Sequence, residues 1–432
     1  MASTVIYKDS IATGVYKFTF SAWVKRSKIG SNQTLLGMYN NNNYRGKIRF
    51  DHNTGDDLLY VWIKHPSAGE FNWYSNAKFR DTNGWYHIVV AIDTTQSTAS
   101  NRYKIYVNGE EISGTNSGID LTQNSTSMIF GHSKHSIGNS YYNGSWESQY
   151  FDGLMSHVHC CYGYAYQASD FGETDSTTGE WKIKTNLSVS YGSNGHFILK
   201  DGNSTTDQSG NSISLTTNGT LTKTEDNPSN VFATLNPLAR RLTNNAPTYL
   251  NGNTSLQGQT VDGQYNNAIA TIGDISTGKF YWEVKVGNIA DGFGVGISDT
   301  PNQANGTTSG NYYVYYGADG NKDVNGSTTS YGASYTTNDI IGVAIDATSG
   351  SVTFYKNGVS QGTADTALIT NMVHGYTPVG YTNKGLMNWN LGNGYFGTTA
   401  VSSAGTNASG NGIFEYDVPT GFTALSTKGL NL

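Results

Sequence analysis

The chain has 432 residues, of which 13% are charged and 12% are aromatic, and its formal net charge at pH 7 is −6. Many aromatic residues and few charges exclude an intrinsically disordered chain, and the negative net charge argues against a nucleic-acid-binding surface. No apolar run approaches the roughly 18 residues of a membrane span, so membrane insertion is not expected. The composition predicts a soluble, all-β protein with more than one domain.

Residues 16–170 consist of short segments in which apolar and polar side chains alternate, separated by turns rich in Gly, Asn, Asp and Ser. In residues 18–25, positions 18, 20, 22 and 24 are apolar, and this period of two predicts a half-buried strand. Asn108-Gly109 predicts a hairpin turn, because both residues tolerate positive φ. Further strands are expected at 47–50, 58–64, 71–79, 85–93, 104–107, 128–131 and 150–164. Strands at this density, with no helical period between them, predict a β-sandwich.

Three segments of this region carry a family resemblance. Residues 85–93 begin with Trp-Tyr-His before an apolar run, residues 106–109 read Tyr-Val-Asn-Gly, and residues 151–155 read Phe-Asp-Gly-Leu-Met. Together they resemble the closing strands of concanavalin A-like jelly rolls of the laminin-G kind, which implies a jelly roll over residues 16–170. The usual first strand of that fold is not evident in residues 1–15. We therefore expect this N-terminal arm to pair elsewhere in the protein or with another subunit.

Residues 171–237 differ from the region before them, because they contain polar runs rich in Ser, Thr, Asn and Gly. Two interpretations are open: a flexible linker, or an ordered connector with one or two strands. The alternation of Phe197, Leu199, Ile213 and Leu215 favours the ordered connector.

Residues 238–432 return to strand-forming sequence. Four segments stand in the order and spacing of a SPRY domain, which is a bent two-sheet sandwich used for binding: 278–286, 294–297, 339–346 and 352–358. The resemblance rests on the runs Gly-Lys-Phe-Tyr-Trp-Glu-Val, Gly-Val-Gly-Ile and Phe-Tyr-Lys-Asn-Gly within them. The whole chain is thus predicted to be all-β, with a jelly-roll and a SPRY-like β-sandwich joined by a short β-containing connector.

The SPRY resemblance also implies which segments of the second sandwich meet a partner. In SPRY domains partners contact the loops between strands, which correspond here to residues 303–310 and 318–328. The tyrosine-rich segment 312–316 is expected to lie on a core strand and to serve packing.

The order of the domains carries a further resemblance. The jelly roll ends at residues 169–173, the connector reaches residues 234–237, and the chain closes with residues 419–425 after the SPRY-like domain. This arrangement resembles virion-associated proteins of tailed bacteriophages from aquatic hosts, especially cyanophage and marine phage. It implies a place in the virion, as a tail fibre or another appendage, with other virion proteins and host-surface polysaccharide as partners. A purely structural head or tail decoration is the alternative.

Assembly with further copies of the chain is expected as well. Sandwich sheets otherwise leave exposed edges, and symmetric homo-oligomers are the usual outcome for such proteins. A trimer is the first expectation.

The sequence does not predict an enzyme. A sugar-cleaving jelly roll needs two carboxylates a few ångströms apart, and the Glu-x-Asp-x-x-Glu strand of such glucanases does not occur. Glu110 and Glu111 are adjacent and point apart, and the pair of Glu173 and Asp175 lacks a third acid. There is no Gly-x-Ser-x-Gly nucleophile motif. A glycan-degrading enzyme is the third hypothesis, after adhesion and a purely structural role.

Binding of carbohydrate is better supported by the residue types present. Aromatic rings stack on the apolar faces of sugars, and amides and hydroxyls bind their hydroxyl groups. The candidate residues lie in the turn-rich segment 137–146 and are Tyr141, Tyr142, Asn143 and Trp146. The alternative is that this segment only covers the sandwich or contacts another subunit.

Two segments raise the question of metal binding. Residues 51–57 are rich in Asp and Asn, and calcium prefers such oxygen ligands, although the spacing is not that of an EF-hand. His157 and His159 share a strand face with Cys161, as a metal site requires. We favour the simpler interpretation that Cys160 and Cys161 are two small strand residues with no metal, because no second ligand cluster appears in the sequence. We predict no cofactor and no metal ligand, and leave calcium open.

Overall fold

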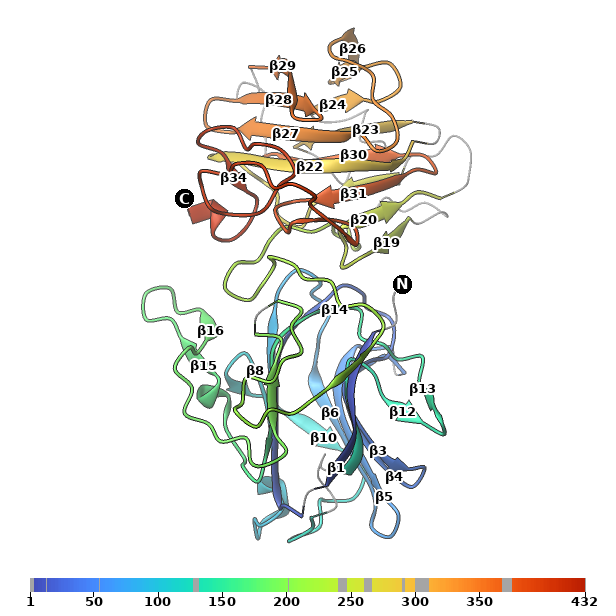
Figure 1. The fold of residues 1–432 in the computed structure, drawn as a ribbon, viewed down its shortest axis with the longest axis vertical. Helices are drawn as coiled ribbons and strands as arrows, with labels where there is room; N and C mark the ends of the chain where they lie inside the picture. Colours follow the sequence, from blue (N-terminus) through green and yellow to red (C-terminus); the bar gives the residue numbers. More distant parts are fainter. Residues whose placement is uncertain are drawn as a thin grey trace. The chain divides into compact units, whose positions relative to one another are not determined.

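The computed structural model describes residues 4–12, 14–53, 55–126, 132–200, 202–239, 247–259, 266–289, 292–299, 311–366 and 375–431. These residues form strands and short 3₁₀ turns, and no α-helix occurs among them. A helix long and apolar enough to cross a membrane is accordingly not found in this part of the chain. The chain divides into two compact units, Met1–Lys223 and Thr224–Leu432 (Figure 1).

The first unit contains two large antiparallel sheets, which Figure 1 shows as two facing layers. One sheet has the order β10-β6-β5-β4-β3-β11-β1-β18, and the other has the order β17-β14-β2-β7-β8-β9. The first sheet comprises β1 (Val5–Ala12), β3 (Gln33–Asn41), β4 (Tyr44–Asp51), β5 (Leu58–His65), β6 (Gly69–Lys78), β10 (Gly114–Asn116), β11 (His132–Ile137) and β18 (Thr216–Asn218). The second comprises β2 (Lys17–Arg26), β7 (Tyr86–Asp93), β8 (Tyr103–Val107), β9 (Glu110–Glu111), β14 (Gly153–Tyr162) and β17 (His196–Ile198).

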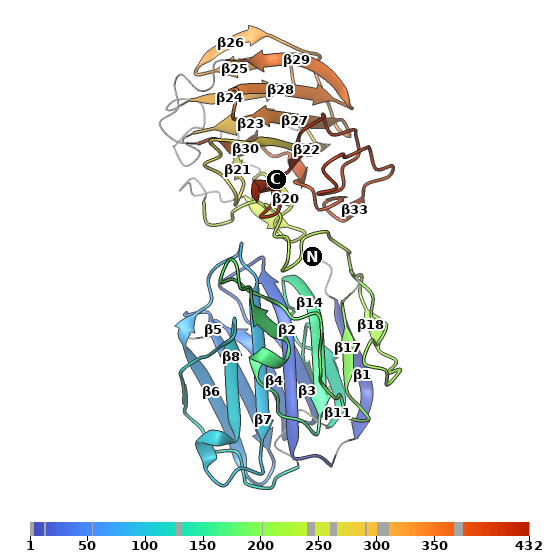
Figure 2. The same cartoon turned by 90° about the vertical axis from the view of Figure 1, so that its left-hand side faces the viewer.

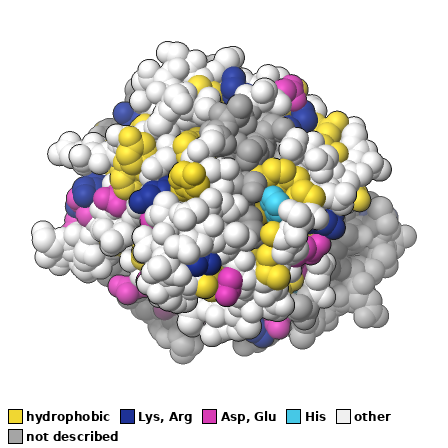
Figure 3. All heavy atoms as spheres, turned by 90° about the horizontal axis from the view of Figure 1, so that it is seen from below, with side chains coloured by type: hydrophobic (Ala, Val, Ile, Leu, Met, Phe, Trp, Pro, Cys, Tyr) yellow, Lys and Arg dark blue, Asp and Glu magenta, His cyan; other side chains and the backbone are white. Residues whose placement is uncertain are grey.

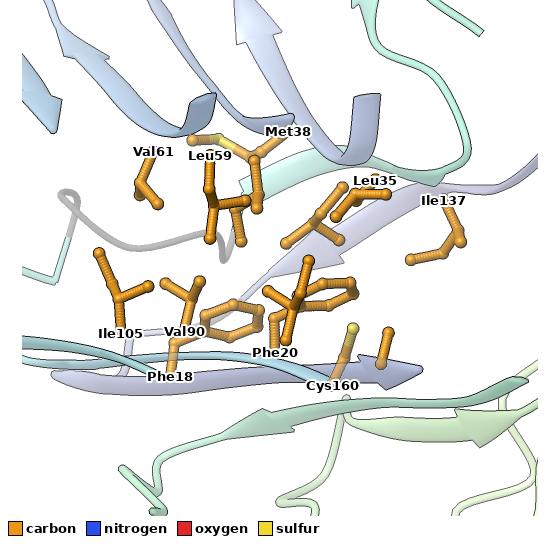
Figure 4. Packing of buried hydrophobic residues seen from close by; sticks show 14 of the residues in the cluster. Phe18, Phe20, Leu35, Met38, Leu59, Val61, Val90, Ile105, Ile137 and Cys160 are labelled. Carbon is orange, nitrogen blue, oxygen red and sulfur yellow. The ribbon is translucent and has the colours of Figure 1, made fainter. Parts of the chain in front are cut away.

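The core of the first unit fills the space between these sheets. Phe18, Phe20, Ala22 and Val24 alternate along β2 and are fully buried, so the predicted period of two sets which side chains face inward. Figure 4 shows Phe18 and Phe20 from one sheet opposite the apolar side chains of the other. Burial of each such large side chain stabilises the fold by about 1.5–3 kcal/mol. Every strand predicted in residues 16–170 overlaps an observed strand, except 128–131, which lies outside the described residues.

The outer face of β2 is also buried, and the prediction of a half-buried strand is wrong in this respect. Thr19, Ser21 and Trp23 are at most 4% exposed. Thr19 donates to the carbonyl of Tyr164 and accepts a hydrogen bond from the N–H of Tyr166 (both 2.9 Å). The ring of Trp23 stacks on that of His87, and His87 in turn contacts Trp181 of the small β15 (Gly172–Thr174) and β16 (Trp181–Ile183) sheet. The indole N–H of Trp181 donates to Nδ1 of the buried His87 (3.0 Å), which leaves Nε2 to donate to Ser21 (2.9 Å).

The N-terminal arm is part of the first sandwich. β1 pairs antiparallel with β11 on one side, where Ile6 stands opposite Ile137, and with β18 on the other. Val5 and Ile6 are buried, so apolar burial as well as backbone pairing holds this strand in the sheet.

The boundary between the units falls inside the segment 171–237 that we predicted as the connector. β17 pairs with β14, and β18 pairs with β1, so residues up to Lys223 extend the sheets of the first unit. Residues from Thr224 onward belong to the second unit, where Phe232 and Leu235 are buried. The segment contains strands, as the ordered interpretation expects.

The second unit is also a sandwich of two sheets, visible in Figure 2 with its strands stacked one above another. One sheet has the order β19-β20-β31-β22-β27-β28-β29, with β34 parallel to β22, and the other has the order β21-β30-β23-β24-β25-β26. The first comprises β19 (Thr248–Leu250), β20 (Ser255–Gln257), β22 (Lys279–Asn288), β27 (Ile340–Asp346), β28 (Ser351–Lys356), β29 (Val359–Asp365), β31 (Leu386–Asn390) and β34 (Thr423–Ala424). The second comprises β21 (Asn266–Ile269), β23 (Phe293–Ser298), β24 (Tyr312–Tyr316), β25 (Asn321–Val324), β26 (Ser327–Ser330) and β30 (Thr377–Thr382). A further small pair is β32 (Tyr395–Phe396) with β33 (Thr399–Ala400).

A buried carboxylate joins the C-terminal segment to β22. Glu283 is fully buried, and its two oxygens accept hydrogen bonds from the backbone N–H groups of Glu415 and Tyr416, both at 2.9 Å. The hydroxyl of Tyr281 also donates to Glu283 (3.1 Å). Burial outweighs these hydrogen bonds and raises the pKa of Glu283 to about 7.

Candidate functional site

The four predicted binding residues lie on one β-hairpin, not in an irregular loop. β12 (Tyr141–Tyr142) pairs with β13 (Ser145–Trp146), and the connecting Asn143 and Gly144 have φ values of 46° and 86°. Positive φ at both positions is the signature of the two-residue hairpin turn that Asn-Gly favours. The turn signal of this segment predicts a hairpin that we did not assign.

Two of the four residues anchor this hairpin to the sheet. Tyr141 stands opposite Trp146, with ring centroids 5.1 Å apart. The ammonium of Lys134 on β11 lies 4.7 Å from the Tyr141 ring, 5.4 Å from Trp146 and 4.6 Å from Tyr7 on β1. Lys134 also pairs with Asp9. These contacts with Lys134 on β11 hold the hairpin against the sheet. Tyr141 and Trp146 are half exposed.

The other two residues point outward and meet the turn between β3 and β4. Tyr142 is 37% exposed, and the guanidinium of Arg45 lies 3.9 Å from its ring centroid. The side chain of Asn143 accepts a hydrogen bond from Asn42 (3.2 Å), which in turn accepts one from the hydroxyl of Tyr39 (3.0 Å). We call Tyr39, Asn42, Arg45, Tyr142 and Asn143 the hairpin patch.

A network of charged and amide side chains supports the hairpin from below. Lys47 on β4 forms an ion pair with Glu147 (2.7 Å), and Arg49 donates to Gln149 (2.8 Å). Ser140 donates a further hydrogen bond to Glu147. Burial raises the pKa of Glu147, but its hydrogen bonds and the charge of Lys47 lower it further, so the net shift is downward. These contacts fix the patch on the rigid sheet.

Aromatic side chains continue along the outer face of β5 and β6. The rings of Tyr60 and Tyr74 are stacked with centroids 4.3 Å apart, and the Tyr60 hydroxyl donates to Asn72 (2.6 Å). The indole N–H of Trp62 donates to Glu70 (3.1 Å), and Arg45 lies 5.0 Å from the Trp62 ring. Arg45 thus connects the hairpin patch to a row of rings and polar groups in which Tyr60 and Trp62 are buried.

Sequence reasoning missed the half of the patch that comes from the β3–β4 turn. Tyr39, Asn42 and Arg45 are about a hundred residues from the hairpin in sequence, and only sheet pairing between β3 and β11 brings the segments together. A local signal was available, because residues 39–45 read Tyr-Asn-Asn-Asn-Asn-Tyr-Arg.

A hollow lies elsewhere on the surface of the first unit. It has a volume of about 260 Å³ and is bordered by η1 (Ala99–Asn101), β8 and the segment before β10. Its lining is mainly polar, with Ser100, Lys104 and Glu111, beside the half-buried ring of Tyr103. Unlike the hairpin patch, it brings no exposed aromatic ring together with amides.

Two segments of the second unit, residues 303–310 and 318–328, are predicted to contact a partner, and the structure describes only the second. Residues 303–310 lie outside the described residues. Residues 318–328 contain β25 and the start of β26, whose four residues are exposed. Tyr312, Tyr313 and Tyr315 of β24 are at most 2% exposed, so their assignment to the core is confirmed.

The carboxylates of the candidate calcium loop have cationic partners. Asp51 pairs with Arg49, Asp56 with Lys78, and Asp57 with Arg26 at 2.9 Å. A calcium ion there would have to displace these basic groups.

The neighbouring cysteines are free and buried, Cys160 in the core between the sheets and Cys161 on the opposite face with Phe171. A bulge between Ser156 and His159 interrupts the strand, and His157 has a φ of 49°. His157, His159 and Cys161 do not form a group of metal-ligating atoms within the described residues.

Comparisons with known families agree with this architecture. Residues 3–170 match the concanavalin A-like lectin/glucanases superfamily, and residues 279–379 match the SPRY domain. The chain combines a concanavalin A-like domain with a SPRY domain. Both lie where the sequence predicted them, and the first match includes nearly all of the arm assigned to residues 1–15. None of the curated proteins matches the chain.

Solved structures are also similar to parts of the chain. The SPRY domain of human HERC1 is 20% identical, covering 36% of this chain and 96% of that one, with a TM-score of 0.31. A pentraxin from Limulus polyphemus is 13% identical, covering 38% and 71%, with a TM-score of 0.29. Domain 4 of an extracellular arabinanase from Geobacillus stearothermophilus, solved with arabinotriose, is 16% identical, covering 38% and 68%, with a TM-score of 0.28.

Proposed function

We propose that the concanavalin A-like domain binds carbohydrate through the hairpin patch. The observation that carries this proposal is the exposed ring of Tyr142 beside the guanidinium of Arg45 and the amides of Asn42 and Asn143. A ring supplies a stacking surface for the apolar face of a sugar, and the amides and guanidinium bind its hydroxyl groups. The match to a superfamily of lectins and glucanases supports the same class of ligand.

The patch also meets the requirement that a binding surface be held in place before the ligand arrives. Lys134 among its three rings and the Lys47–Glu147 ion pair fix the hairpin on the sheet. A fixed patch loses little conformational freedom on binding, so more of the contact energy remains as affinity.

We propose binding without catalysis. Retaining and inverting glycosidases need two carboxyl groups free to act on either side of the bond that breaks. Three of the four acids that sequence reasoning considered have lysine partners: Glu111 pairs with Lys104 (2.8 Å), and Glu173 and Asp175 pair with Lys182. Incubation with a bound polysaccharide tests this, because new reducing ends would contradict it.

We further propose that the protein works as an adhesion component of a phage virion, a tail fibre or another appendage that binds host-surface polysaccharide. The support is the resemblance of the domain order to virion-associated proteins of tailed phages. On the face in Figure 3 acidic and basic side chains lie near one another, among hydrophobic side chains, and neither sign of charge forms a large patch, which suits a neutral glycan partner. Cross-linking mass spectrometry of particles and sedimentation of the purified chain test the location and the expected trimer. A purely structural decoration would show no saturable binding to host cells.

A matched pair of variants tests the binding site itself. Tyr142→Ala removes the exposed ring of the patch, and Tyr16→Ala removes a ring of similar exposure, 44%, elsewhere on the same unit. On glycan arrays and by calorimetry with the best glycan, we expect Tyr142→Ala to weaken affinity roughly tenfold, or about 1.4 kcal/mol. Tyr16→Ala should bind like the wild type. Equal affinity of both variants and the wild type would refute the assignment of the patch.

A further inference from the structure

Three metal-ligating side chains meet inside the first unit. They are His135 on β11, Cys160 on β14 and His196 on β17, and their ligand atoms all lie within 4.8 Å of one another. The three residues are 1%, 0% and 0% exposed. They come from both sheets, so the cluster lies where the two layers of the sandwich face each other.

Strand register explains how these residues come together. Cys160 and His196 stand directly opposite each other in the β14–β17 pair, so both side chains lie on the same face of that sheet. Figure 4 shows Cys160 directed from its strand into the space between the sheets. His135 reaches the same place from the other sheet, and its ring centroid lies 5.5 Å from that of His196.

The histidines of the cluster differ from the other buried histidines of this unit. His87 is hydrogen-bonded to Trp181 and Ser21, and Nδ1 of His159 is hydrogen-bonded to Tyr191 (2.9 Å). In contrast, Nε2 of His135 is buried without a hydrogen-bond partner. A buried polar atom left in this state costs about 1–3 kcal/mol.

His196 lies in a similar environment. Neither of its ring nitrogens has a hydrogen bond of normal geometry, although the backbone of Asn194 favours its charged form. Ring nitrogens without regular hydrogen bonds lie within 4.8 Å of a thiol, so a metal ion could bind all three donor atoms.

We propose that His135, Cys160 and His196 bind one transition-metal ion, zinc or copper(I), that ties the two sheets of the first unit together. A thiolate with two imidazoles is a donor set that these ions prefer, whereas calcium and magnesium prefer oxygen. Zinc lies about 2.0 Å from nitrogen and about 2.3 Å from sulfur, so donor atoms around it are roughly 3–4 Å apart. The present spread of at most 4.8 Å needs only small side-chain rotations to reach this geometry.

The electrostatic surroundings agree with this donor set. Burial lowers the pKa of His135 and lowers that of His196 to about 4, so both rings are neutral and able to bind a metal. Burial raises the pKa of the Cys160 thiol, and a bound cation would offset the cost of the thiolate after its proton leaves to solvent. A copper(I) thiolate carries no net charge. A zinc thiolate carries one positive charge, and the negative charge of Asp207 acts favourably on that position.

Metal content of variants tests the site, with a control that the chain itself supplies. Cys161 is the other buried thiol, on the opposite face of the same strand. The untagged full chain is expressed with added zinc or, separately, copper, dialysed, and analysed by inductively coupled plasma mass spectrometry. We expect one equivalent of zinc or of copper in the wild type and in Cys161→Ser, and loss of the metal in Cys160→Ser. A wild type without metal, or equal content in both variants, would overturn the proposal.

A spectroscopic measurement on the wild type covers the case in which Cys160→Ser does not fold. The chain is refolded with cobalt(II) in place of zinc, and the near-ultraviolet thiolate-to-cobalt charge-transfer band reports whether cysteine binds the ion. X-ray absorption of the zinc or copper form should give one sulfur and two imidazole nitrogens around the metal. A spectrum without sulfur would refute the site whatever the behaviour of the variants. Neither measurement involves carbohydrate, so its result is independent of the proposed function.

Discussion

The two units use neighbouring tyrosines in opposite ways. On β12, Tyr142 is 37% exposed and contacts Arg45, whereas on β24, Tyr313 and Tyr315 are at most 2% exposed and pack in the core. Tyr142 lies on the two-stranded β12–β13 hairpin, whereas Tyr313 and Tyr315 lie on an inner strand of a six-stranded sheet. Residue type alone therefore does not identify a binding surface. The position of the strand in its sheet decides which rings remain available.

The sharpest test of this contrast removes one ring of each kind. Tyr315→Ala deletes a fully buried ring that lies 4.9 Å from Tyr335 and 5.6 Å from Phe354. We expect a loss of about 3–5 kcal/mol in the unfolding free energy of the second unit, because the ring leaves a cavity. Hydrogen exchange of β27 peptides in the full chain measures it.

Tyr142→Ala is the matched variant, and it should lower the stability of the first unit by less than about 1 kcal/mol, since exposed side chains contribute little. Similar losses for both substitutions would show that the hairpin ring is structural, and the contrast between the units would fail.

A half-buried glutamate in the first unit and a buried glutamate in the second give a second contrast. Glu147 has the cation Lys47 as its partner, whereas the hydrogen bonds to Glu283 come from uncharged donors. Replacing Glu283 by Ala leaves the N–H groups of Glu415 and Tyr416 without their acceptor. We expect this variant to lose about 1–3 kcal/mol of unfolding free energy, seen as faster exchange of peptides in residues 411–426.

The two glutamates should also respond to pH with opposite sign. The pKa of Glu283 is raised from 4.5 to about 7 in the folded chain, so the folded state binds its proton more tightly than the unfolded state. Its contribution to stability is therefore lost as pH rises from about 4.5 to about 7. The pKa of Glu147 is lowered, so its contribution is present above the ordinary glutamate pKa and is lost as pH falls below it.

Glutamine variants isolate these two effects from every other titrating group. The difference in unfolding free energy between the wild type and Glu283→Gln should fall as pH rises towards 7. The corresponding difference for Glu147→Gln should fall as pH is lowered below about 4.5. Denaturant unfolding across this pH range measures both. A rise with pH for Glu283 would mean that its N–H donors outweigh burial.

The sequence predicts local features of this protein well. The alternation of Phe18 and Phe20 predicts a core strand, and Asn108-Gly109 predicts a hairpin turn. In the structure Asn108 and Gly109 have φ values of 50° and 90°, as such a turn requires. The exposure of Tyr142 and Asn143 also follows from their local context, because they lie in a turn-rich segment.

What the sequence does not predict depends on pairing between distant segments. Arg45 meets Tyr142 only because β11 pairs with β3. The outer face of β2 is buried because residues distant in the sequence, such as Tyr166 and Trp181, fold against it or against the neighbouring His87. The grouping of His135 with Cys160 likewise depends on how two sheets face each other. Contacts between distant segments produce no periodic pattern and no fixed spacing of residues, so a single sequence does not predict them.

The smallest expected difference concerns two Asn-Gly turns at hairpin tips, one in each unit. Asn143 and Asn325 have φ values of 46° and 52°, so alanine at either position adopts a strained backbone at a cost of about 1–2 kcal/mol. Glycine relieves that strain and isolates the side-chain contacts. Asn325 accepts a hydrogen bond from the backbone of Tyr312 (2.8 Å), whereas the contact of Asn143 with Asn42 is exposed. Asn325→Gly should therefore lower the melting temperature of its unit by a few degrees, and Asn143→Gly should leave that of the first unit nearly unchanged. If both glycine variants melt like the wild type, the hydrogen bond between Asn325 and Tyr312 does not stabilise the second unit. The two hairpins would then not differ in the way proposed.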